Sequence, residues 1–370
     1  MTLILGRRIE KPEAEKESSL DDYLVMVADS MASYAGKENH SVSKEDRSQK
    51  MYVVGEKKNF LIMGTGRGDM IRNVALSLYD ANLDSLKEAS DAILEITDGF
   101  DPGDTITPLN FIVGGNYVIE RENRRELGFA HVVATVVPPD QKASSAEYRQ
   151  REGSLCYDAV DGSGAIPVME HKKKSAQFGK DMVFDLADVL VELYEQGKAG
   201  AQDTGVNDKL QFGIINKNSA STIYHPDIWL VSSQHFDEYL TRMAKITLPE
   251  VKPEDVKGHY GLAEMKNDVK KVLTSFYDAW TAELRELSEL RQGYTQWADA
   301  FGNDEAKYRE GFEAIKARRQ LARRNVLEGA NALVTKGLEA LVSYTRAADI
   351  RKRAIESKLL GNPEKPIAKQ

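Results

Sequence analysis

Short apolar runs, separated by glycine and charged turns, fill the first two thirds of the chain. Runs of this length that are rich in Val, Ile, Leu and aromatic residues are typical of β-strands. The pattern predicts strands over residues 2–6, 23–30, 50–54, 59–64, 110–118, 128–137, 154–160, 209–216 and 220–226. A short charged sequence between the third and fourth of these strands predicts a hairpin turn.

Apolar residues that recur every three or four positions predict three helices among these strands. The first begins in the glycine-rich sequence after residue 64, the second covers residues 83–97 and the third covers residues 180–197. Strands and helices do not alternate strictly, as they would in a doubly wound fold. The order favours a layered α+β domain, which we place over residues 1–250.

The remainder of the chain has a helical pattern almost without a break. Two long apolar seams are separated by a glycine and an Asn-Asp pair at residues 302–304. They predict a hairpin of antiparallel helices over residues 251–360, preceded by a proline-containing linker. Basic residues gather at residues 316–353, where they predict a solvated face or a docking surface for an acidic protein partner. Residues 361–370 are expected to form a disordered tail.

The overall composition is that of a globular protein, with 41% hydrophobic and 29% charged residues in a chain of 370. A formal net charge of −8 argues against a nucleic-acid partner, whose binder would be basic. The single cysteine, Cys156, excludes an intrachain disulfide and fits a reducing compartment. No run approaches the roughly 18 apolar residues of a membrane-spanning helix, so we expect a cytoplasmic protein without a membrane partner.

Neither a metal nor an organic cofactor is expected from the motifs. The six histidines are scattered, without the spacing of metal ligands. Gly64, Gly66 and Gly68 follow a predicted strand, but they lack the glycine spacing of a dinucleotide-binding loop.

Thr2 is the first candidate for catalysis. Removal of the initiator methionine would leave a chain that begins with a hydroxyl beside a free α-amine. Such an amine can act as the general base for its own hydroxyl, because α-amino groups titrate near about pH 7.7 to 8.0 and are partly neutral at physiological pH. A nearby lysine would lower the pKa of the amine further through like-charge repulsion. A Met-Thr start alone carries little information, so the residues that follow decide its weight.

Four sequence motifs begin at Thr2 and follow in a fixed order. The strand MTLILG is followed by VMVADSMASYAG, by QKMYVV and by FLIMGTGRGD at the start of a helix. In this order and strand context the motifs resemble the proteasome β-subunit family of N-terminal-nucleophile (Ntn) hydrolases. The resemblance covers about residues 2–235 and implies a four-layer αββα sandwich, followed here by the all-α helical hairpin.

The resemblance implies catalytic roles for five residues. Thr2 corresponds to the nucleophile that begins the first strand, Asp29 to the buried acid that ends the second strand, and Lys50 to the catalytic lysine. Further along, Ser163 in the sequence VDGSGA corresponds to a hydroxyl that supports the terminal amine. Asp203 corresponds to a supporting aspartate.

Three further residues correspond to positions that bind substrate. Ser33 matches the position whose backbone pairs with an extended peptide substrate. The backbone N–H of the oxyanion hole corresponds to Gly64 or Thr65, because an additional glycine in GTGRGD leaves the choice open.

Two positions depart from the family pattern. Val206 stands where the family usually has a second supporting serine, and Ser30 stands where a basic residue often follows the aspartate of the second strand. The loop between the first two strands and the region 118–153 are also longer than usual. The absent second serine gives some weight to a catalytically inactive protein, against which the intact Thr2, Asp29 and Lys50 argue.

The correspondences predict a threonine-type peptidase that cleaves peptide or protein substrates with Thr2 as nucleophile after removal of Met1. The same site could pass its acyl group to an amine, which would make the protein a peptide ligase or transpeptidase. A third hypothesis is a catalytically inactive scaffold or assembly subunit. Because family members usually form rings, we expect a homo-oligomer, and the helical extension is a candidate docking site for a protein partner.

Overall fold

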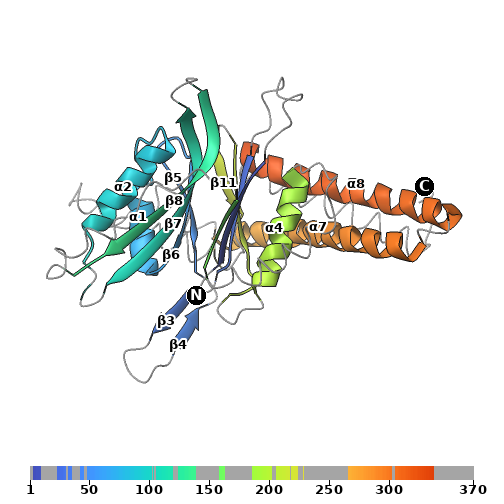
Figure 1. Cartoon of the computed structure of the whole chain (residues 1–370), viewed down its shortest axis with the longest axis horizontal. Coiled ribbons are helices and arrows are strands. Elements are labelled where there is room, and N and C mark those ends of the chain that lie inside the picture. The colour runs from blue at the N-terminus through green and yellow to red at the C-terminus, as the bar shows by residue number, and fades with distance from the viewer. Residues whose placement is uncertain are drawn as a thin grey trace, which may run out of the picture.

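The computed structural model describes residues 3–9, 23–30, 32–35, 42–45, 48–101, 103, 106–119, 124–138, 158–162, 186–201, 206–216, 218–223, 228, 266–301 and 305–336. In these residues the chain forms two large antiparallel sheets flanked by helices, with a pair of long helices at one end (Figure 1). The α+β fold class predicted from the sequence is confirmed at this level.

The first sheet holds the start of the chain between two other strands. Within the described residues its strands are ordered β11 (Ala220–Ile223), β10 (Gln211–Ile215), β2 (Tyr23–Ala28), β1 (Leu3–Ile9) and β9 (Asp158–Gly162). All neighbours are antiparallel, and Leu5 lies opposite Val27 of β2 and Val160 of β9. Because β1 is paired on both edges, its register is fixed from both sides.

The second sheet begins with the strand that directly follows Lys50 in the sequence. Its strands in the described residues are ordered β5 (Met51–Val54), β6 (Phe60–Thr65), β7 (Thr107–Ile119) and β8 (Arg124–Val136). The predicted hairpin turn between β5 and β6 is present. Gly55 and Lys58 have φ angles of 86° and 49° there, in the left-handed region that tight hairpin turns use.

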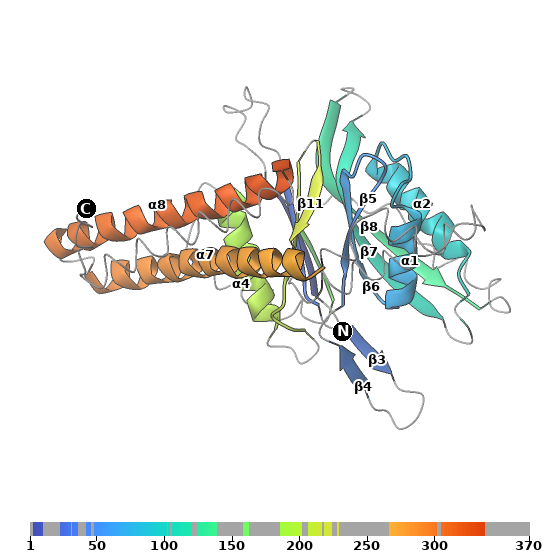
Figure 2. The same cartoon turned by 180° about the vertical axis from the view of Figure 1, so that it is seen from behind.

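A small hairpin projects from the body of the molecule beside the start of the chain (Figures 1 and 2). It consists of β3 (Ala32–Ala35) and β4 (Val42–Glu45), with Ser33 opposite Lys44. The sequence pattern predicted neither strand, because each has only four residues and no apolar run. The predicted strand over residues 23–30 correspondingly ends earlier, at Ala28.

Successive residues of a strand point to opposite faces, and both faces of both sheets are covered. In β1, Ile4 lies in the core between the two sheets, whereas Leu3 and Leu5 lie in a second core on the outer face of the first sheet. This second core includes α4 (Leu186–Gly200), which is the described part of the helix predicted over residues 180–197.

A third core lies on the outer face of the second sheet. It is formed by β6, β7 and β8 together with α1 (Gly68–Ser77) and α2 (Leu86–Asp98). The Ser85 hydroxyl caps α2 by accepting a hydrogen bond from the Glu88 amide. The helices predicted after residue 64 and over residues 83–97 are thus confirmed, with small shifts at their ends.

The long helices are α7 (Lys266–Phe301) and α8 (Glu305–Lys336), which lie side by side in both views (Figures 1 and 2). Trp280 donates a hydrogen bond to the Val326 carbonyl, and Arg318 donates one to Glu286. Later residues of α7 therefore meet earlier residues of α8, as in the predicted antiparallel hairpin. Residues 229–265 and 361–370 lie outside the described part of the chain, so the domain boundary near residue 250 and the disordered tail stay predictions.

The proximal half of this hairpin packs against the outer face of the first sheet. Phe276 and Trp280 of α7 are fully buried in the core that contains α4, and the Trp280 ring meets the Phe212 ring of β10 edge-on at 5.0 Å. Arg319 and Arg323 of α8 both form ion pairs with a single carboxylate of α4.

That carboxylate is Asp188, which is 5% exposed and accepts two hydrogen bonds from Arg323 Nη1 at 2.8 and 2.9 Å. Arg319 lies 3.6 Å from the same carboxylate. Arg319 and Arg323 each keep 24% of the side chain exposed, so α4 covers these two residues of the predicted basic face in part. The docking surface expected at residues 316–353 stays a prediction.

Candidate active site

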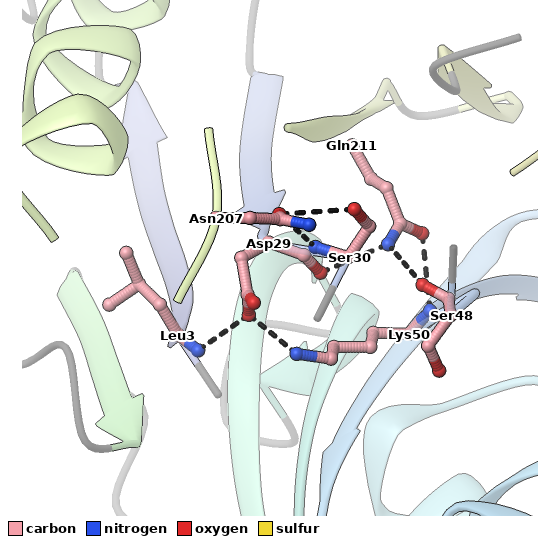
Figure 3. Close-up of polar contacts among 7 residues, drawn as sticks. All are labelled: Leu3, Asp29, Ser30, Ser48, Lys50, Asn207 and Gln211. Atoms are coloured by element: carbon pink, nitrogen blue, oxygen red, sulfur yellow. Dashed lines mark hydrogen bonds and ion pairs between the residues drawn. The ribbon is translucent and has the colours of Figure 1, made fainter. Parts of the chain in front are cut away.

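Asp29 and Lys50 meet where β2 ends and β5 begins (Figure 3). The Lys50 ammonium donates a hydrogen bond of 2.6 Å to Asp29 Oδ1, and the same oxygen accepts a hydrogen bond of 2.8 Å from the Leu3 backbone amide. The Asp29 amide in turn donates to the Leu3 carbonyl at 3.1 Å. The structure therefore brings the two predicted residues together at the start of β1.

This ion pair is buried. Asp29 is 0% exposed and Lys50 is 7% exposed. Burial lowers the pKa of the Lys50 ammonium below its ordinary value of 10.5, and the charge of Asp29 and its hydrogen bond oppose that change. Buried ion pairs seldom gain much stability over apolar packing, and perturbed pKa values are common at functional sites.

Gln211, the first residue of β10, is bound to both sides of the ion pair. Its side-chain nitrogen donates to the Asp29 carbonyl at 3.0 Å and to the Ser48 carbonyl at 2.9 Å. Its side-chain oxygen accepts a hydrogen bond of 3.1 Å from the Lys50 amide. The sequence pattern did not single out Gln211, although a glutamine that begins the apolar strand QFGII is an unusual polar position.

Asn207 makes a second polar contact that the sequence analysis missed. Its side-chain oxygen accepts hydrogen bonds of 3.1 Å from both the amide and the hydroxyl of Ser30. The Ser30 carbonyl accepts a hydrogen bond from the Ser48 amide at 2.7 Å. The segment after β2 is therefore hydrogen-bonded to the segment before β5, and Ser30 takes part in this connection.

Gly64 and Thr65 lie at the same end of the second sheet as Lys50. Met63 is opposite Met51 in the β5–β6 pairing, so Gly64 follows at the level of Lys50. A Cβ atom on Gly64 would lie 2.7 Å from the Ile71 side chain of α1, and one on Gly66, where φ is 118°, would lie 2.6 Å from the Pro108 carbonyl. The turn from β6 into α1 therefore depends on glycine at both positions.

The remaining predicted residues differ in what is described of them. Ser33 is in β3, opposite Lys44, and only its backbone is described. Thr2, Ser163 and Asp203 lie outside the described residues.

Val206, which the resemblance aligns with a second supporting serine, is 4% exposed and belongs to the core under α4. Its side chain packs with apolar residues of the first sheet and cannot supply a hydroxyl.

The described residues contain no group of three or more His, Cys, Asp or Glu side chains placed to hold a metal ion. Among the described helices, none combines the length and the apolar character needed to cross a lipid bilayer.

No protein-family model and no curated protein matches this chain. A functional proposal for it therefore depends on the motifs, the fold and the geometry around Asp29 and Lys50.

Proposed function

We propose that the chain is a threonine-type peptidase of the Ntn hydrolase class, with Thr2 as nucleophile after its amine is freed from Met1. One observation carries the proposal: the buried Asp29–Lys50 ion pair also holds the backbone N–H of Leu3. That nitrogen is covalently bonded to the carbonyl carbon of Thr2, so the ion pair is held one residue from the proposed nucleophile.

The arrangement of the sheets supports the same class. Apolar cores lie between α1, α2 and the second sheet, between the two sheets, and between the first sheet, α4 and the hairpin. We interpret this order of helices, sheet, sheet and helices as the four-layer αββα sandwich that the resemblance implies.

In the proposed reaction, the neutral Thr2 amine takes the proton of the Thr2 hydroxyl as the oxygen attacks a peptide carbonyl. The positive charge of Lys50 keeps the amine neutral by lowering its pKa through like-charge repulsion. Asp29 orients the Lys50 ammonium and balances its charge. The amine then gives the proton to the leaving amino group, and an ester between Thr2 and the acyl part of the substrate remains.

Water completes the cycle by attacking this ester. The Thr2 amine takes a proton from the water, the acyl product leaves as a carboxylic acid, and the hydroxyl is restored. We assign the oxyanion contact in both steps to the backbone N–H of Gly64 or Thr65, an interaction worth several kcal/mol in acyl-transfer sites. Ser163 and Asp203 are proposed to support the amine, and the Ser33 backbone to pair with the substrate.

One observation favours a second candidate, an inactive scaffold. Val206 is buried among apolar side chains at the position of the second supporting serine. A site that lacks one supporting hydroxyl has fewer groups to position the Thr2 amine. The intact Asp29–Lys50 pair favours the peptidase.

Reaction with a β-lactone, which a nucleophilic hydroxyl opens to give an ester, tests the peptidase. We expect intact-protein mass spectrometry to show loss of Met1 and a single adduct, and peptide mapping to place the adduct on Thr2. The Thr2→Ala variant is the matched control and should remain unlabelled. A fully retained Met1 or an unlabelled wild-type protein would exclude the mechanism and favour the scaffold.

A further inference from the structure

Gln211 uses both faces of its side-chain amide on the main chain of two different segments. The nitrogen donates hydrogen bonds to the carbonyls of Asp29 and Ser48, and the oxygen accepts one from the Lys50 amide (Figure 3). These distances lie between 2.9 and 3.1 Å. Gln211 is 0% exposed, so water does not compete for these bonds. One side chain thus links Asp29, which follows β2, to Lys50, which precedes β5.

The link crosses from one sheet to the other. Gln211 begins β10 of the first sheet, and Asp29 follows β2 of the same sheet. Ser48 and Lys50 lie just before β5 of the second sheet. The two ends are joined by the Asp29–Lys50 ion pair and by Gln211 in parallel. A change in the distance between the sheets at this end would alter both connections together.

We propose that Gln211 is a positioning residue that fixes the Lys50 ammonium against Asp29 and the start of β1. Its expected effect on turnover rests on the proposed peptidase function, whereas its expected effect on Lys50 does not. Gln211 touches neither the reacting hydroxyl nor the amine in this role. It acts through the backbone of Asp29 and Lys50.

Helix α7 contacts both sequence neighbours of Gln211, namely Leu210 just before β10 and Phe212 within it. The Tyr277 hydroxyl donates a buried hydrogen bond of 2.9 Å to the Leu210 carbonyl, and the Trp280 ring packs edge-on against Phe212. Burial raises the pKa of Tyr277, so its hydroxyl remains a neutral donor. The hairpin therefore supports the strand position from which Gln211 reaches the site.

The test compares Gln211→Asn, which keeps the amide on a shorter side chain, with Gln211→Met, which keeps the length and loses every hydrogen bond. Gln196→Asn is the matched control, because Gln196 is also 0% exposed and donates a hydrogen bond to Glu192 within α4. The first measurement is the titration of Lys50 by NMR with isotope-labelled lysine. Its signal is identified as the one that Lys50→Ala lacks.

In the wild-type protein the titration midpoint of Lys50 should lie below 10.5. Both Gln211 variants should raise it by about one pH unit or more, because a loosened site admits water and relieves the desolvation that dominates this pKa. Peptide turnover should fall about tenfold or more in kcat, with KM within about twofold. Gln196→Asn should change neither the midpoint nor kcat.

A Lys50 midpoint that stays at the wild-type value in a folded Gln211 variant would overturn the positioning role. Failure of both Gln211 variants to fold would also overturn it, since the side chain would then serve the fold as a whole. A wild-type protein that neither hydrolyses peptides nor reacts with the β-lactone, while the midpoint still moves in the variants, would refute the peptidase proposal and leave the positioning role supported.

Discussion

Asp29 accepts two hydrogen bonds through a single carboxylate oxygen, one from the Lys50 ammonium and one from the Leu3 amide. Burying a charged ammonium away from water without a partner would cost several kcal/mol or more, so the charge of Lys50 depends on Asp29. Because the same oxygen accepts both hydrogen bonds, a displacement of Lys50 would change the contact between Asp29 and the Leu3 amide of β1. At this scale the candidate site is one shared acceptor with two donors.

Replacing Lys50 with alanine should abolish peptide turnover and also lower stability. The variant removes the charge that we propose tunes the Thr2 amine. It also leaves Asp29 buried without its ammonium, a loss that typically costs roughly 3–5 kcal/mol. Lys50→Arg should be inactive as well, because a planar guanidinium does not replace a compact ammonium in a closed site. Urea unfolding and peptide hydrolysis on the same preparations measure the two effects.

The double variant Lys50→Met with Asp29→Asn separates charge balance from catalysis. It removes both charges and keeps an acceptor for the Leu3 amide, so much of the lost stability should return while turnover stays absent. Peptide turnover near the wild-type level in Lys50→Ala would contradict the proposed role of the lysine.

The sequence pointed to Asp29 and Lys50 through the resemblance of its motifs to the proteasome β-subunit family, in which the second strand ends at the aspartate and the third begins at the lysine. Gln211 could not be found in this way, since its hydrogen bond to Asp29 joins residues 182 positions apart. A polar residue in an apolar strand shows that it has a partner but does not show which one. Thr2, Ser163 and Asp203 stay predictions, because they lie outside the described residues.

At the scale of elements, the junction of β6 and α1 joins the second sheet to the helices that cover it. Its geometry follows from two close approaches, of Gly64 to Ile71 and of Gly66 to Pro108. The apolar run and the glycines predicted a strand followed directly by a helix, and the structure confirms this order. The β3–β4 hairpin was missed because its strands carry no periodic apolar pattern.

Gly64→Ala should destabilise the protein by about 1–3 kcal/mol, because the new methyl group would overlap the Ile71 side chain. Gly68→Ala is the matched control, since a Cβ atom there would have nothing within 4 Å. It should be neutral or raise stability by up to about 1 kcal/mol through a less flexible unfolded chain. Equal unfolding free energies for the two variants in urea would contradict this account of the junction.

At the scale of the whole molecule, the helical hairpin is bound to the sheets by a shared apolar core and by the ion pairs of Asp188. The sequence predicted the two helices and their apolar seams. It could not show that α4 and the first sheet would cover those seams, because periodicity identifies an apolar face without identifying its partner. The same limit explains why the ion pairs of Arg319 and Arg323 with Asp188 were not predicted.

Deleting residues 255–370 should prevent the remaining chain from folding stably. The deletion would expose the outer face of α4 and of β10 that Phe276 and Trp280 now cover, and the removal of a single buried Phe or Trp side chain already costs roughly 3–5 kcal/mol. Circular dichroism melting and the soluble yield measure the result. Deletion of residues 361–370 is the control and should leave the melting temperature unchanged, whereas a cooperative melt in the longer deletion would show an independent domain.

The atoms that Asp29 binds at the start of β1 belong to Leu3, and a peptide N–H at Leu3 is present whether or not Met1 is still attached. The Asp29–Lys50 arrangement therefore needs no cleavage in order to form. Under the proposed mechanism, a precursor that carries Met1 would fold with its catalytic lysine in place yet lack the free amine that acts as base. Under this mechanism, hydrolysis of the Met1–Thr2 peptide bond in the folded precursor would be the only covalent step of maturation.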